Sequence, residues 1–250
     1  MVAQPLIDTE APGACEGVWA QWRASRPELR IQDWRHLVVV APHPDDEVLG
    51  AGGLIALLRS ADIPVTLIAV TDGEASHPGS PTYAPAELAA LRIEESQNAA
   101  YELATGAPMR LGMPDGGIAE QETELADLLG YVLSRLGGPG VRCAATWRHD
   151  GHPDHEAVGR AAATACGNTA TELLEYPVWM WHWGAPQHPR VASESAYALP
   201  LPPSAVAAKA RAMAQHRTQI RPLSDHRADR PVLPTHILQR FTAPDEVFFQ

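Results

Sequence analysis

Short unbroken apolar runs alternate along the chain with longer segments whose apolar residues recur at helical spacing. The apolar runs are typical of strands buried on both faces of a sheet, and they lie at residues 37–41, 64–70, 109–112, 141–147 and 172–178. The helical segments lie at residues 16–25, 47–59, 87–103, 122–136 and 154–166. Strands that alternate with helices in this way form a parallel sheet with helices on both faces. We therefore expect an α/β fold, a Rossmann-like three-layer α/β/α sandwich with a mostly parallel sheet.

The last part of the chain is less regular. Its apolar spacing predicts a helix over Ser204–Gln219. Trp179, Trp181 and Trp183 alternate with other residues, as they would on one face of an extended segment, and we expect two of the three in the core. No internal repeat or long linker divides the chain. We expect a single domain over 1–250, made of an N-terminal arm and helix (1–35), a core (36–180) and a C-terminal extension (181–250).

Composition narrows the classes of function. The formal net charge is −11 and only 19 of the 250 residues are lysine or arginine. Nucleic-acid binding and attachment to anionic membranes both need clusters of positive charge, so we expect neither. Cys15, Cys143 and Cys166 are widely spaced and form no CxxC pair, which predicts reduced, buried thiols. The N-terminus has no basic segment followed by an apolar one, and no apolar run approaches the length of a membrane span, so we expect a cytoplasmic protein.

A first polar cluster, His43-Pro44-Asp45-Asp46-Glu47, directly follows the first buried run. Imidazole and carboxylate groups together suit Zn²⁺ or a similar divalent ion. Two of these side chains can bind the ion while another carboxylate takes a proton from its water. The alternative is an ordinary helix cap by Asp45 or Asp46. That alternative accounts poorly for so many polar groups at the end of a strand that is otherwise expected to be buried away from water.

A second cluster, His152-Pro153-Asp154-His155, follows the fourth apolar run. Taken alone, it is equally consistent with a surface turn that Asp154 caps. Ligands in parallel α/β sheets bind at the carboxyl ends of the strands. Because both clusters come directly after strands, we expect them to meet at that edge and to form the active site there.

The two clusters resemble the two signatures of the LmbE-like, or PIG-L, N-deacetylase family. The resemblance covers roughly residues 36–180. It implies that His43, Asp46 and His155 bind zinc. Fe²⁺ could occupy the same ligand set and is the alternative native metal. The resemblance also implies that Asp45 is the general base and that His152 stabilises the oxyanion or protonates the leaving amine.

The same resemblance implies substrate contacts at Arg92 and Asp115. Asp150 stands where some members have a tyrosine, and we expect it near the substrate, orienting His152 by a hydrogen bond. Three histidines outside the two clusters, His77, His216 and His226, are expected at the solvent-exposed surface, with a place in a substrate lid as the alternative for His77.

The expected function is that of a zinc-dependent N-deacetylase acting on an N-acetylated amino sugar or sugar conjugate, in natural-product or thiol biosynthesis. Its partner would be that small-molecule substrate, and the resemblance leaves room for a homo-oligomer. Two alternatives remain open: an amidase for a larger amide or thiol conjugate, and a non-catalytic protein that a metal ion stabilises.

Overall fold

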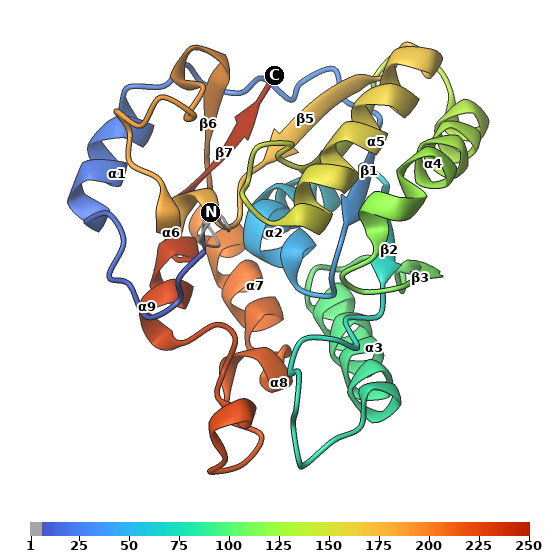
Figure 1. The fold of residues 1–250 in the computed structure, drawn as a ribbon. Helices are drawn as coiled ribbons and strands as arrows, with labels where there is room; N and C mark the ends of the chain where they lie inside the picture. The colour runs from blue at the N-terminus through green and yellow to red at the C-terminus, as the bar shows by residue number, and fades with distance from the viewer. Residues whose placement is uncertain (1–6) are drawn as a thin grey trace.

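The structure, a computed structural model, describes residues 7–250 and is built on a seven-stranded sheet (Figure 1). The strand order is β3-β2-β1-β4-β5-β7-β6. The strands are β1 (His36–Ala41), β2 (Val65–Thr71), β3 (Met109–Met113), β4 (Val141–Thr146), β5 (Glu172–Tyr176), β6 (Ala196–Pro200) and β7 (Asp245–Phe249). Strands β1 to β5 pair in parallel, whereas β7 runs antiparallel to both β5 and β6. The predicted fold class, a mostly parallel α/β sandwich, is confirmed.

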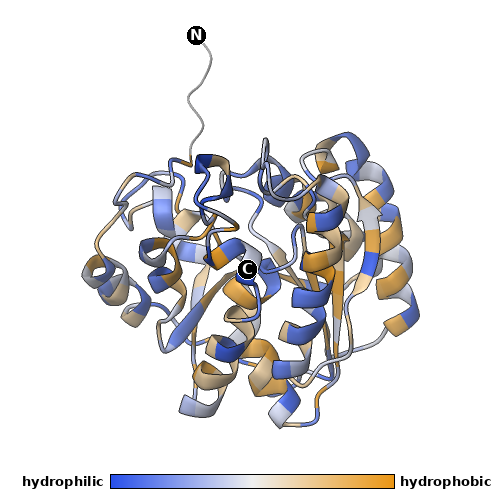
Figure 2. Ribbon diagram, turned by 90° about the horizontal axis from the view of Figure 1, so that it is seen from below, coloured by the Kyte–Doolittle hydropathy of each residue, from blue (hydrophilic) through white to orange (hydrophobic). Residues whose placement is uncertain are grey.

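Helices cover both faces of this sheet (Figure 1). They are α1 (Glu16–Ala24), α2 (Asp46–Ser60), α3 (Pro85–Glu102), α4 (Glu122–Leu136), α5 (Pro153–Thr169), α6 (Met180–Trp183), α7 (Pro203–Met213), α8 (Arg217–Ile220) and α9 (Thr235–Leu238). Helices α4 and α5 pack on one face, and α2, α3 and α7 pack on the other. Apolar and polar stripes run along the helices that flank the sheet (Figure 2).

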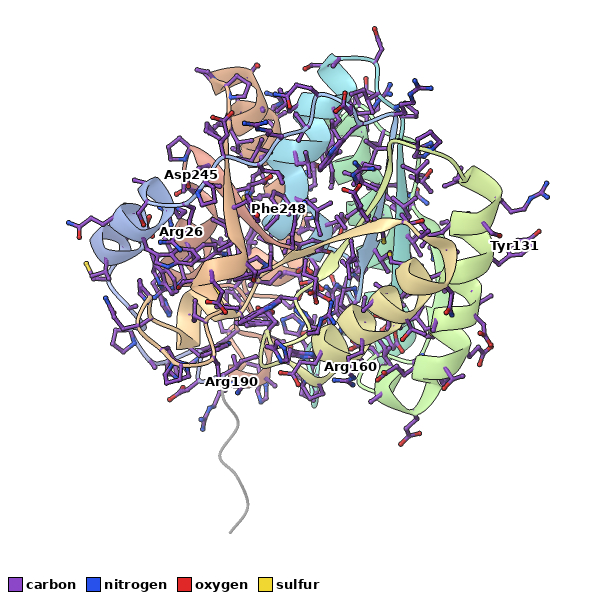
Figure 3. All side chains as sticks on the ribbon, turned by 90° about the horizontal axis from the view of Figure 1, so that it is seen from above. Arg26, Tyr131, Arg160, Arg190, Asp245 and Phe248 are labelled. Carbon is purple, nitrogen blue, oxygen red and sulfur yellow. The ribbon has the colours of Figure 1, made fainter. Side chains whose placement is uncertain are left out.

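The central strand β1 explains why the apolar runs are unbroken. Leu37 and Val39 belong to one core, while Val38 and Val40 belong to the core on the opposite face, and all four are fully buried. Side chains alternate across a strand, so a strand covered on both sides needs apolar residues at every position. In Figure 3, Phe248 of β7 lies inside the molecule, whereas Tyr131 of α4 projects from its edge.

Three expectations about local structure are wrong. The segment with alternating tryptophans is not extended, because residues 180–183 form α6. The helix expected to reach Gln219 stops at Met213, and the short α8 follows it. Cys15 is exposed rather than buried. In the first case, backbone N–H groups at the start of α6 donate to the buried carboxylate of Asp150, a contact that the local pattern does not reveal.

Among the helices of residues 7–250, none combines the length and the apolar character that crossing a bilayer requires.

Candidate metal centre and its cavity

The order of the strands brings the two polar clusters together. Strand β1 lies between β2 and β4. The strand order reverses at β1, because β2 and β3 extend the sheet on one side and β4 and β5 extend it on the other. A crevice forms at such a switch point, beyond the carboxyl ends of the strands. The turn after β1 carries His43, and the loop after β4 leads to His152 and His155 at the start of α5. Clusters more than a hundred residues apart therefore share one site.

Three side chains in this crevice fit a metal ion. His43 Nδ1 lies 3.1 Å from Asp46 Oδ2, and His155 Nε2 lies 3.3 Å from the same oxygen. Zinc ligands about 2.0–2.2 Å from a tetrahedral ion lie about 3.3 Å from one another. The donor atoms of His43, Asp46 and His155 form a group that could hold a metal ion, as the sequence predicts. We call these three side chains the metal group.

The charges of this group are strongly perturbed. Burial alone would raise the pKa of the Asp46 carboxyl, but His155 and His43 hold it well below its usual range. Burial would lower the pKa of His155, yet Asp46 and Asp150 raise it to about 9. A carboxylate between two imidazoles favours the binding of protons. A metal cation can take the place of those protons on the same donor atoms.

Carboxylates lie behind both imidazoles of this group. Asp150 Oδ2 lies 2.8 Å from His155 Nδ1. His43 Nε2 lies 3.2 Å from Asp154 Oδ2 and 3.1 Å from Asp115 Oδ1. Such partners fix the ring orientation and leave the other nitrogen free to bind the ion.

The expectation for Asp150 is therefore wrong. This residue is fully buried and bonds to His155 rather than to His152, and it does not line the cavity. Its carboxylate also accepts the backbone N–H groups of Val178, Trp179 and Met180. Asp150 thus holds the His155 ring and the start of α6 together.

Asp45 lies on a strained turn beside the metal group. Its φ of 134° is in the region that favours glycine. Two contacts hold the turn: Glu47 Oε2 accepts the Asp45 N–H, and the buried Arg92 donates to Pro44 O at 2.8 Å. Burial raises the pKa of Asp45 to about 8, with the Arg92 charge opposing it and the Asp46 charge adding to it. A carboxyl group with such a pKa suits a general base near neutral pH.

His152 presents a defined nitrogen to the cavity. The Asp154 N–H donates to His152 Nδ1 at 3.2 Å, so the neutral ring carries its proton on Nε2. Burial, followed by the charges of His155 and His43, lowers the pKa of His152 to about 3. Since His152 lines the cavity, this ring offers an N–H donor there.

The cavity has a volume of about 190 Å³. One side is polar and contains the metal group, Asp45 and His152. The other side is apolar and is lined by Leu49, Val178, Trp179, Val232 and Leu233. Arg92 and Asp115 lie on the wall, as predicted for substrate contacts, but both already have partners. Arg92 donates to the carbonyls of Pro44 and Gly73, and Asp115 accepts the Ala75 N–H, so their contact with substrate stays a prediction.

Other residues differ from the sequence expectation. His77 and His216 are buried, with exposed fractions of 5% and 2%, although both were expected at the surface. The contact of Asp154 with His43 was not foreseen, because a helix-capping role already explained an aspartate at that position. Gln219 also lines the cavity, and no pattern around it in the sequence indicates this.

Fold and site together define an α/β protein with a buried histidine–aspartate–histidine group at the carboxyl edge of its sheet. Comparison with known proteins gives the family. The sequence profile of the PIG-L family, described as GlcNAc-PI de-N-acetylase, matches residues 38–166, which is just over half of the chain. The chain belongs to this family.

Curated relatives are similar over the same region. A probable N-acetyl-α-D-glucosaminyl L-malate deacetylase 2 from Bacillus subtilis is 38% identical over 133 residues, which is 52% of this chain and 60% of that protein. A diacetylchitobiose deacetylase from Thermococcus kodakarensis is 26% identical, over 52% of this chain and 48% of that protein. The chain thus spans about 60% of the length of the Bacillus subtilis relative that it matches.

Solved structures share the fold. A conserved protein from Thermus thermophilus is 28% identical with a TM-score of 0.55, and the match covers 74% of this chain and 80% of that one. The zinc-inhibited form of a teicoplanin deacetylase is 19% identical with a TM-score of 0.63, covering 86% of this chain and 97% of that one. At that identity, the second likeness concerns the fold alone.

Proposed function

We propose that this protein is a zinc-dependent N-deacetylase that hydrolyses the acetamide of an N-acetylated amino sugar or sugar conjugate. The observation that carries the proposal is the group of His43, Asp46 and His155 donor atoms, with Asp45 beside it in one cavity. The names of the curated relatives, which are deacetylases of N-acetylglucosamine derivatives, support the substrate class.

In this proposal, His43 Nδ1, Asp46 and His155 Nε2 would hold the ion. A divalent ion supplies Lewis-acid polarisation of a carbonyl group and a water of lowered pKa. The carboxylates of Asp150 and Asp154 would fix the orientation of both imidazole rings and leave the opposite nitrogens free for the ion. Zinc suits this set because three protein ligands leave one position open for chemistry.

Asp45 and His152 have different roles in the reaction of the substrate. Asp45, on its strained turn, removes a proton from the attacking water and passes it towards the amine that leaves. His152 donates its Nε2–H to the oxyanion that develops when the acetamide carbonyl is attacked. The products are acetate and the free amine.

The experiment measures acetate release from N-acetylglucosamine conjugates and from analogues with longer acyl chains, using protein with a known zinc content. We expect about one zinc per chain and turnover of the acetyl substrates. An Asp45→Asn variant should bind zinc normally and lose activity by a factor of about 10²–10⁴. Asp127→Asn, the same change at an exposed site on α4, is the control and should keep full activity.

Two outcomes would contradict the proposal. Zinc binding without hydrolysis of any amide would favour a metal-stabilised binding protein. Turnover of the longer acyl substrates alone would favour the amidase alternative, because the chemistry would be the same while the substrate differs.

A further inference from the structure

The C-terminal part of the chain completes the cavity. Gln219 of α8, Val232 and Leu233 line it together with the metal group, yet all three lie beyond residue 166, where the family match ends. The Leu233 N–H donates to Gln219 O at 2.9 Å, so the two segments are joined at the cavity wall. This wall therefore lies outside the region that the family profile matches.

The side chain of Gln219 is held in one orientation. Thr218 donates its N–H to Glu95 Oε1 at 2.8 Å and its hydroxyl proton to Glu95 Oε2 at 2.7 Å. Because that proton is engaged, Thr218 Oγ1 is an acceptor for Gln219 Nε2, 2.9 Å away. Ser76 Oγ lies 3.4 Å from the same nitrogen. The amino group of Gln219 thus faces both hydroxyls.

The amide oxygen of Gln219, Oε1, is the other polar atom of this side chain. Gln219 has 1% of its surface exposed and lines the cavity. Within residues 7–250, no hydrogen-bond donor lies within bonding distance of its Oε1. This oxygen is nevertheless not closed off from solvent. An acceptor that is accessible and has no donor from the protein can accept a hydrogen bond from a ligand, and a ligand that lacks the matching donor binds less well. The apolar side chains of Val232 and Leu233 line the same cavity, and the lower local polarity that they create strengthens such a bond.

We infer that Gln219 is a substrate-binding residue whose Oε1 accepts a hydrogen bond from one hydroxyl group of a sugar ring. This assignment rests on the proposed function for the identity of the substrate. It makes Gln219 a determinant of which sugar is accepted, acting from a part of the chain that the family match does not cover.

The test measures binding of the methyl glycoside of N-acetylglucosamine by calorimetry to zinc-loaded protein carrying Asp45→Asn, so that the ligand is not consumed. A set of analogues, each lacking one hydroxyl group, is measured in parallel. We expect one analogue to bind about tenfold more weakly than the parent ligand. Adding Gln219→Met should weaken binding of the parent ligand about tenfold and leave that one analogue unaffected.

Gln215→Met is the matched control. It makes the same chemical change four residues earlier, where the side chain donates to Arg211 O and does not line this cavity. Its binding of every ligand should equal that of the parent protein. Circular dichroism of each variant reports whether it folds.

Several results would overturn the assignment. One is an unchanged affinity of the Gln219→Met variant, and another is a loss that is equal for the parent ligand and all analogues. If that variant does not fold, the analogues decide alone, because equal binding of all of them to protein with Gln219 intact excludes the contact. Binding that depends on Gln219, without turnover by the wild-type protein, would refute deacetylation but support the assignment. Absence of any sugar binding would refute both.

Discussion

Replacing Asp150 with asparagine tests whether the carboxylate behind the metal group orients it. Asp150 is fully buried, and each of its oxygens accepts two hydrogen bonds. Oδ1 accepts the N–H groups of Val178 and Met180, both at 3.0 Å. Oδ2 accepts the N–H of Trp179 at 2.9 Å and lies 2.8 Å from His155 Nδ1. Asparagine keeps the size of the side chain but exchanges one of these oxygens for an amino group.

The size of the effect follows from the bonds lost. Whichever way the new side-chain amide of the Asp150→Asn variant turns, its amino group faces two N–H donors and accepts from neither. Each hydrogen bond to a charged group contributes about 1.5–3 kcal/mol. Loss of two such bonds should lower the free energy of unfolding of the metal-free protein by about 3–6 kcal/mol. Loss of a carboxylate behind a metal-binding imidazole should also weaken zinc binding about 10- to 100-fold, or by about 1.4–2.7 kcal/mol.

Two assays separate these effects. Denaturant unfolding in the presence of a chelator measures stability without metal, and competition with a chromophoric chelator measures zinc affinity. Asp127→Asn serves again as the control, since this exposed side chain should affect neither quantity. Wild-type zinc affinity in a destabilised Asp150→Asn variant would show that Asp150 supports only α6. Wild-type values in both assays would refute the reasoning.

Three further predictions concern stability and metal dependence. Arg92→Met should lower the free energy of unfolding by about 2–4 kcal/mol, because two buried carbonyl groups lose their donor; an unchanged denaturant midpoint would contradict this. Gly50→Ala should destabilise by about 1–3 kcal/mol, since the added Cβ would lie 2.0 Å from Tyr176 Cδ2. Gly130→Ala, where nothing lies within 4 Å, should instead stabilise by up to about 1 kcal/mol, and equal thermal midpoints for the two variants would refute the packing argument. Removal of metal by a chelator should abolish acetate release and lower the thermal midpoint, and zinc should restore both; activity that survives complete removal would exclude metal-dependent hydrolysis.

Local features of the sequence were sufficient to predict the fold class. The unbroken run at β1 needs two covered faces, and this follows from the alternation of side chains along a strand. The segments of α1 to α5 were foreseen in the right order, with ends displaced by at most three residues. Prediction was poorer beyond residue 180. There, short helices such as α6 depend on bonds to distant residues rather than on their own apolar spacing.

The metal group shows the same division within one site. His43 and Asp46 share a single turn, and His155 belongs to a motif with its own signature, so their grouping could be predicted from the sequence and from the rule for parallel sheets. The role of Asp150 could not be predicted from the sequence. An aspartate near two histidines can face either ring, and only the packing of α6 against the loop after β4 decides for His155.

The sequence by itself determined the fold class, the edge of the sheet where the site forms and the side chains that gather there, because each depends on residues close together in the chain. The tertiary structure decided which nitrogen of each imidazole faces the metal position, that His77 and His216 are buried, and that Gln219 reaches the cavity. These features depend on contacts between distant segments, and both burial and hydrogen-bond direction exist only once those segments have packed.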